Sequence, residues 1–300
     1  MGKYINGIEH IISREFTLAV NMGLVPGWEP GLDKFGMNPL VAPSTDPEDL
    51  WEGGGMYNFS DDGVSDIDTL SSSDVSDVGQ LIKIRGILSS DISIQGEKIG
   101  WSITNGQNKV LIFDNQNLTG DPIKFWRVSR KENEANAGGE LAGSLYCYVD
   151  GAITAGVPDV ASTIRSIILN GNNQTQMTIF TVPRGKVGLL FRGEIGMKFT
   201  APPNSNEFVE GTYQSRRFGK VFKIKKTISS MAQGNSNYLD KRSFPDIIPA
   251  LTDIKITANE VSANMGVWGT LDMLIADEDQ FSDAFIGNVP FLQAIGQPGF

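Results

Sequence analysis

Few residues of this 300-residue chain could carry acid–base or nucleophilic chemistry. The sequence contains one histidine, His10, and one cysteine, Cys147. His10 falls in a predicted N-terminal helix, so histidine catalysis would have to come from the least core-like part of the chain. Cys147 lies in the alternating run Leu145-Tyr146-Cys147-Tyr148-Val149, which predicts a buried structural thiol. One cysteine excludes an internal disulfide framework, and no Cys/His spacing suggests zinc.

Carboxylates are the remaining candidates for chemistry. Asp61 with Asp62, or Asp277 with Glu278 and Asp279, could in principle serve glycoside hydrolysis, which needs two carboxyl groups facing each other across a cleft. The sequence has no phosphate-binding GxxxxGK loop, no GxSxG elbow and no HExxH motif. We therefore expect a protein that is not an enzyme and that uses no metal or cofactor.

Composition indicates an ordinary soluble globular chain. Hydrophobic residues make up 40% of the sequence and charged residues 20%, and the formal net charge is −10. This acidity argues against a nucleic-acid-binding protein, which normally carries a basic surface. No apolar run is long enough to span a bilayer, and charged residues interrupt any signal-peptide core near the start. We expect neither a membrane partner nor export.

The first 30 residues predict an arm. Apolar residues recur at helical spacing over residues 6–20, and Asn6 with Glu9 forms a plausible capping pair. Proline and glycine then dominate up to Gly31, which indicates an extended, turning segment. The arm could pack on its own domain or reach into a neighbouring subunit.

An acidic stretch follows, because residues 35–82 contain no lysine or arginine. Clustered carboxylates can bind calcium, but the spacing does not reproduce an EF-hand loop. The pattern favours a solvated acidic surface, or one that faces a basic partner. The acidic residues are Asp46, Glu48, Asp49, Glu52, Asp61, Asp62, Asp66, Asp68, Asp74 and Asp77.

From residue 81 the chain is typical of strands and turns. In the clearest segment, Leu189, Phe191, Ile195, Met197 and Phe199 alternate with polar residues, which predicts one apolar strand face. Many short strands with little helical periodicity predict an all-β protein, an antiparallel β-sandwich or jelly-roll-like fold with an N-terminal arm and a short helix. We expect an arm over 1–30, a Gly-rich acidic segment over 31–80 that packs on the core, a sandwich core over 81–285 and a tail over 286–300.

One basic segment interrupts the acidic surface between Arg216 and Lys226, where basic residues alternate with aromatic and aliphatic ones. It could be an edge strand whose lysines prevent pairing with another sheet. It could instead dock onto an acidic partner, such as residues 46–77 of a neighbouring copy. Nucleic-acid binding is the third interpretation.

Three consecutive glycines, Gly53 to Gly55, lie between Trp51 and Tyr57. Glycine suits a tight turn or a close backbone approach, and the aromatic residues could act as rigid anchors. One interpretation is a plain loop between strands, and the other is an interface. We predict interface residues at both the Gly-rich and the basic segments, namely Phe35, Asn38, Trp51, Gly53, Gly54, Gly55, Tyr57, Arg216, Arg217, Lys223 and Lys225.

Several motifs together resemble a family of tailed-bacteriophage virion proteins that is common among marine phages. They are Lys34-Phe35-Gly36-x-Asn38-Pro39, the run from Asp49 to Tyr57, Ser72-Ser73-Asp74 with Asp77, residues 83–87 and residues 170–185. The resemblance covers roughly residues 31–200 and brings no catalytic motif. It implies a component of the virus particle.

The resemblance and the composition together lead to a preferred function and two alternatives. The chain should be a structural virion protein that acts through protein–protein interfaces, with a head decoration or auxiliary capsid protein as the first choice. A tail, neck or baseplate component is the alternative, and a host-facing receptor- or carbohydrate-binding module is the competing class. Expected partners are further copies of the chain and other phage structural proteins such as the major capsid protein. The expected location is the virion, after synthesis in the host cytoplasm.

Overall fold

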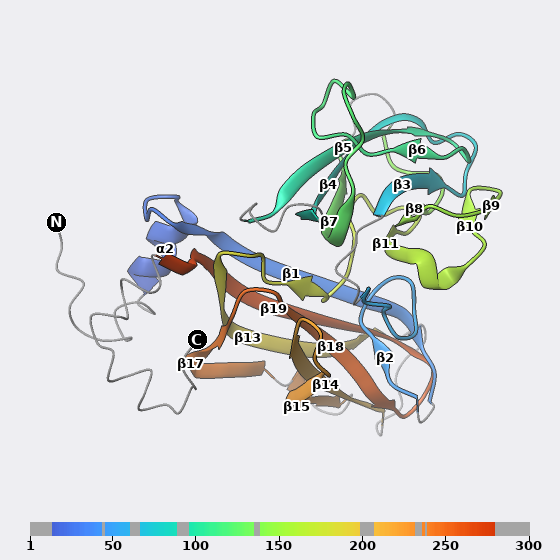
Figure 1. Ribbon diagram of the computed structural model, residues 1–300. Helices are drawn as coiled ribbons and strands as arrows, with labels where there is room; N and C mark the ends of the chain where they lie inside the picture. Colours follow the sequence, from blue (N-terminus) through green and yellow to red (C-terminus); the bar gives the residue numbers. More distant parts are fainter. Residues whose placement is uncertain are drawn as a thin grey trace.

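The computed structural model describes residues 14–43, 46–60, 67–88, 96–134, 139–198, 207–231, 236–237 and 239–279 (Figure 1). Helix α2 (Arg14–Asn21) overlaps the second half of the helix predicted over residues 6–20. Residues 6–13 with His10, the Asp61 and Asp62 pair, and the predicted tail over 286–300 lie outside the described residues. No helix in the described part of the chain is long and apolar enough to cross a membrane.

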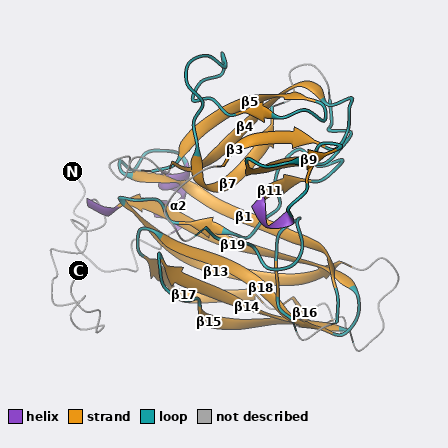
Figure 2. Ribbon diagram, turned by 45° about the vertical axis from the view of Figure 1, so that its right-hand side comes forward, coloured by secondary structure: helices purple, strands orange, loops and turns teal. Residues whose placement is uncertain are grey.

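The sandwich lobe consists of two antiparallel sheets (Figure 2). The first has the order β1, β19, β13, β17, and the second has the order β12, β18, β14, β15, β16 with β2 paired to β18. The strands of the first sheet are β1 (Trp28–Val41), β13 (Lys186–Lys198), β17 (Leu239–Ile248) and β19 (Met265–Asp277). Those of the second are β2 (Glu48–Asp49), β12 (Phe180–Thr181), β14 (Phe208–Arg217), β15 (Lys223–Met231), β16 (Ser236–Asn237) and β18 (Thr252–Val261).

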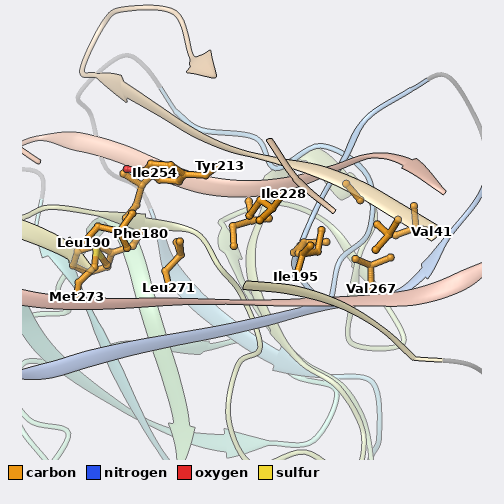
Figure 3. Close-up of a cluster of buried hydrophobic side chains, with 14 of the residues drawn as sticks. Val41, Phe180, Leu190, Ile195, Tyr213, Ile228, Ile254, Val267, Leu271 and Met273 are labelled. Carbon is orange, nitrogen blue, oxygen red and sulfur yellow. The ribbon is translucent and has the colours of Figure 1, made fainter. Parts of the chain in front are cut away.

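The sandwich core lies between these two sheets. Figure 3 shows Leu271 and Met273 of β19 together with Tyr213, Ile228 and Ile254 of the second sheet. Each of these side chains is at most 2% exposed. Alternating strands of this kind bury one face and leave the other free, which is the arrangement that the sequence pattern predicts. The prediction of an all-β, antiparallel sandwich with a short helix is confirmed.

A second lobe is inserted between β2 and β12, and Figure 1 shows it above β1. Its sheet curls on itself, because β6 pairs with β3 while the nearby Phe113 bridges to Trp101 of β5. A separate core lies inside, which includes Ile84, Phe125 and Leu145. The strands of this inserted lobe are β3 (Ile67–Ser72), β4 (Val78–Leu88), β5 (Lys98–Asn105), β6 (Val110–Leu111), β7 (Phe125–Asn133), β8 (Leu145–Val149) and β11 (Ile164–Ile168), beside a small hairpin of β9 (Ile153–Thr154) and β10 (Val157–Pro158) and a 3₁₀ turn (Ala161–Thr163).

The two cores change the domain boundaries expected from the sequence. The segment expected over 31–80 is divided, since β1 and β2 belong to the sandwich whereas β3 and the start of β4 belong to the inserted lobe. The single core expected over 81–285 is likewise two cores. The reason is that β1 pairs with β19 from the far end of the chain, and local residue patterns do not report such a long-range pairing.

Two further differences concern the first sheet. A register shift between Leu190 and Arg192 moves the apolar residues of β13 from one face to the other. Leu189 therefore packs on the outer face beside Val20 of helix α2, whereas Ile195 lies in the sandwich core. The single apolar face predicted for residues 189–199 is thus wrong. Helix α2 packs on its own domain, which is the first of the two arrangements considered for the arm.

Candidate interaction surfaces

The Gly-rich stretch folds into a tight turn at the junction between the lobes. Gly54 and Gly55 have φ angles of 67° and 61°, which favour glycine. Trp51 Nε1 donates a hydrogen bond to the Gly55 carbonyl at 3.2 Å, and a Cβ on Gly53 would lie 2.2 Å from the Trp51 ring. The glycines are therefore required because the chain turns back over its own tryptophan.

Trp51 and Tyr57 are each only 5% exposed. Their rings meet edge to face with centroids 5.2 Å apart, and the Tyr57 hydroxyl donates to the Arg165 carbonyl at 3.1 Å. They belong to a buried cluster with Phe59 and with Ile164 and Ile167 of the inserted lobe. These aromatic side chains hold the two lobes together, in place of the intersubunit contact predicted from the sequence.

Asn38 has a similar internal role. It is 1% exposed, and its Nδ2 donates to Glu48 Oε2 at 2.9 Å. The backbone N–H of Gly55 donates to the same Glu48 oxygen at 3.0 Å, and the Asn38 side-chain oxygen accepts from the backbone N–H of Leu40 at 3.1 Å. The Asn38 side chain therefore anchors a turn and is not available to a partner. An amide beside an aromatic, Gly-rich run looks the same in sequence whether it contacts its own chain or another.

Four of the seven acidic residues that the structure describes in this stretch are buried, which the predicted solvated acidic surface did not anticipate: Asp49, Glu52, Asp68 and Asp77. Asp46 is exposed. Asp49 is fully buried, forms an ion pair with Lys255 at 2.8 Å and accepts a hydrogen bond from Thr257 at 2.7 Å. Asp77 is 1% exposed and accepts hydrogen bonds from the backbone N–H groups of Ala142 and Gly143 at 2.8 and 3.0 Å. Carboxylates can satisfy several backbone donors at once, so these residues tie loops to strands.

Glu52 and Lys131 are buried ionisable residues near this junction. Asn172 Nδ2 donates to Glu52 at 2.7 Å, and burial raises the pKa of Glu52 to about 7. The Lys131 amine donates to the Leu145 carbonyl at 2.7 Å, and burial lowers its pKa to about 8. Cys147 is buried as predicted, and its burial raises the thiol pKa to about 11. That shift makes the thiol a poor nucleophile.

An ion network crosses the lobe junction. Asp253 of β18 is 1% exposed and pairs with Arg127 of β7 at 3.3 Å and with Arg216 of β14 at 3.0 Å. Thr181 donates a further hydrogen bond to Asp253 at 2.5 Å. The Arg127 guanidinium also lies 4.1 Å from the centre of the Trp126 ring. The Arg127 pair crosses between the lobes, whereas Arg216, one of the predicted interface residues, pairs with Asp253 within the sandwich.

The rest of the basic segment lies on an edge strand. Arg217, Lys223 and Lys225 are exposed. One side of β15 pairs with β14. On its other side, the described residues of β16 pair with β15 at Ser230 and Met231 and not at the earlier residues of the strand. A register shift leaves Lys225 as a bulge. Lysines and bulges both discourage pairing with another sheet, so the structure agrees with the edge-strand interpretation.

The inserted lobe carries an apolar recess that the sequence analysis did not identify. Its volume is about 280 Å³, and two of its residues, Ile103 and Leu111, are 42% and 44% exposed. Along β5 the isoleucines point outward and small residues point inward. The inward side has no room for a larger residue at Gly100, where a Cβ would lie 2.6 Å from Ile112. The full lining is Ser102, Ile103, Val110, Leu111, Phe113 and Leu118.

The outer face of β1, β19 and β13 forms a second surface, which we call the aromatic face. The pairing of these strands places Phe35 beside Thr270, and Met37 beside Trp268. Trp268 is also opposite Gly196, where a Cβ would lie 2.2 Å from the indole ring. The indole therefore lies down over the glycine. Its ring stacks against Phe35, with centroids 6.3 Å apart and an angle of 26° between the planes.

Phe35 is the predicted interface residue whose side chain lies on this surface. The sequence analysis did not identify the other residues of the aromatic face. Trp268 could have been placed there, because it alternates with the apolar residues of β19 and shares a face with Thr270 and Asp272. Trp268 therefore belongs to the outer face of β19 by alternation alone, and the structure shows it half-buried there. Asn172 and Gln176 reach the same surface from a loop of distant sequence, which no local pattern could reveal.

No family model matches this chain, and no curated protein matches it. Among solved structures, a chain from the structure of infectious bursal disease virus Gt strain is 9% identical, over 86% of this chain and 76% of that chain, with a TM-score of 0.22. A likeness at this level carries no argument about function. The class that the geometry itself defines is a two-lobed, all-β protein with exposed apolar and aromatic surfaces.

Proposed function

We propose that the chain is a structural component of a bacteriophage virion that acts through protein–protein contacts. The observation that carries this proposal is the apolar recess on the inserted lobe. The sequence resemblance over residues 31–200 supports the same class. Decoration of the head shell remains the first choice, and a place in the tail, neck or baseplate is the alternative.

The chemistry of the recess favours a protein partner. Its one polar side chain, Ser102, donates its hydroxyl hydrogen to the Leu111 carbonyl at 2.8 Å and is therefore already satisfied. The remaining lining is aliphatic or aromatic, so no polar group is available there to orient a small polar ligand. An exposed apolar hollow of this kind fits an apolar side chain from another protein.

The lobe junction supports a role in an ordered assembly. Repeated copies can occupy equivalent positions only if each presents its contact surfaces in the same relative geometry. The buried aromatic cluster and the ion network around Asp253 connect the inserted lobe to the sandwich through side chains from both. The recess is thereby held in a defined position relative to the sandwich.

Copy number in purified virions tests the proposal. Quantitative mass spectrometry against the major capsid protein should give a comparable number if the chain decorates the head. A small number that matches a symmetric ring would indicate the neck, tail or baseplate. Absence of the chain from the particle would refute the structural function.

Substitutions then test the recess. Ile103→Glu and Leu111→Glu should reduce incorporation into particles, because each places a charge in an apolar contact. Val160→Glu is a matched control, since Val160 is 56% exposed and does not line the recess. Equal incorporation of all three folded variants would show that the recess is not the contact site.

A further inference from the structure

The aromatic face has the features of a ligand site, and it is separate from the apolar recess that we propose for assembly. Phe35 is 38% exposed, and Trp268 is held flat against the sheet by the missing side chain at Gly196. Together their rings form an apolar platform on a rigid three-stranded surface. Flat aromatic surfaces of this kind suit a ligand with a planar apolar face.

Polar side chains border the platform. A shallow recess of about 470 Å³, open to solvent, lies between the rings and the amide side chains of Asn172 and Gln176. The Gln176 side-chain oxygen is shielded from solvent and has no hydrogen-bond partner in the described part of the chain. The same holds for the Thr270 hydroxyl, which lies beside Phe35 in the sheet.

The charges on this face restrict the chemistry of the ligand. Asp33 and Asp272 are direct neighbours across β1 and β19, and Glu194 lies next to Thr270 on β13. Arg192 is already engaged with Glu194 at 2.6 Å. Lys198 of β13 lines the recess itself, so this face carries both signs of charge and offers donors as well as acceptors to hydroxyl groups.

We propose that the aromatic face, with Asn172 and Gln176 at its border, binds a neutral saccharide. A sugar ring presents an apolar face of C–H groups to the Phe35 and Trp268 rings, while its hydroxyl groups meet the amides and carboxylates around them. The inference goes beyond the proposed assembly function and does not rest on it, because the apolar recess lies on the other lobe.

Two binding experiments with the full chain test this site. The first is an array of neutral oligosaccharides built from hexoses and N-acetylhexosamines, printed beside uronate-containing oligosaccharides of the same length. The second is titration calorimetry with the neutral oligosaccharide that gives the strongest signal. Phe35→Ala should weaken binding about tenfold, the loss expected when one aromatic stacking contact is removed. Gln176→Ala should weaken it about fivefold, the effect of one hydrogen bond.

Phe218→Ala is the matched control. Phe218 is also 38% exposed and also contacts a tryptophan, Trp126, with centroids 5.1 Å apart, but it lies away from the aromatic face. Its substitution should leave saccharide binding unchanged. Binding to the uronate series alone, no binding to any neutral oligosaccharide, or equal losses for Phe35→Ala and Phe218→Ala would each overturn the proposal. Phe35→Ala should still enter virions normally, so failure of this site is distinguishable from failure of the assembly function.

Discussion

The ion network at the lobe junction makes a quantitative prediction for Asp253→Asn. The substitution preserves the shape of the side chain but removes its negative charge. Arg127 and Arg216 would then remain close together, with side chains that are 5% and 9% exposed. Breaking a buried ion pair on one side costs about 3–5 kcal/mol, because the remaining charge loses its compensation away from water.

The aromatic neighbours narrow this range. Arg127 stays 4.1 Å from the centre of the Trp126 ring, and Arg216 stays 4.5 Å from that of Phe222. Each such cation–π contact contributes about 0.5–2 kcal/mol and survives the substitution. We therefore expect Asp253→Asn to lower the free energy of unfolding by about 3 kcal/mol, at the lower end of the range for buried pairs.

Urea unfolding followed by circular dichroism measures this change, with the free energy obtained by linear extrapolation. Asp150→Asn is the matched control, because Asp150 pairs with Lys109 at 2.7 Å on the surface, where the two side chains are 66% and 38% exposed. Exposed pairs contribute about 0–1 kcal/mol. If the two substitutions lower the free energy of unfolding by similar amounts, the junction is not stabilised by buried charge pairing and this reasoning is wrong.

Three further predictions follow from single buried residues. Burial raises the pKa of Glu52 to about 7; the folded state therefore binds more protons than the unfolded state, and stability should fall as pH rises from about 4.5 to 7. Glu52→Gln should flatten that slope in pH-dependent thermal unfolding, and an unchanged slope would contradict the assignment. Cys147 should not react with a thiol reagent until the protein is unfolded, so stoichiometric labelling of the native protein would refute its burial. Gly36→Ala should yield little folded protein, because its Cβ would lie 2.2 Å from the Thr178 nitrogen and 2.5 Å from the Leu50 oxygen; a normal melting temperature would contradict this packing.

The residues of β19 show why the fold class could be predicted from the sequence. In β19, apolar Val267, Leu271 and Met273 alternate with polar partners, and alternation follows from the two faces of a pleated strand. The same local logic predicted a buried Cys147 and included an edge strand among the three interpretations of the lysine-rich segment. These features depend on residues that are neighbours in the chain.

Other features depend on which strands meet, and the sequence did not reveal them. From the sequence, Asp49 was predicted to be a surface charge. In the structure its carboxylate pairs with Lys255 at 2.8 Å. Trp51 was predicted to anchor an interface with a partner. The sequence cannot distinguish burial by a partner from burial by the same chain, because both favour an aromatic side chain. In each case the deciding contact comes from a distant segment.

Local residue patterns were enough to predict an antiparallel all-β fold with one short helix and one buried thiol. Three features emerged only from the folded chain: the two lobes, the burial of acidic residues such as Asp49 and Asp77, and the aromatic face of Phe35, Gly196 and Trp268. The physical reason is that the side-chain pattern of a strand reports which of its faces is buried, whereas register and strand order arise from long-range pairing and packing.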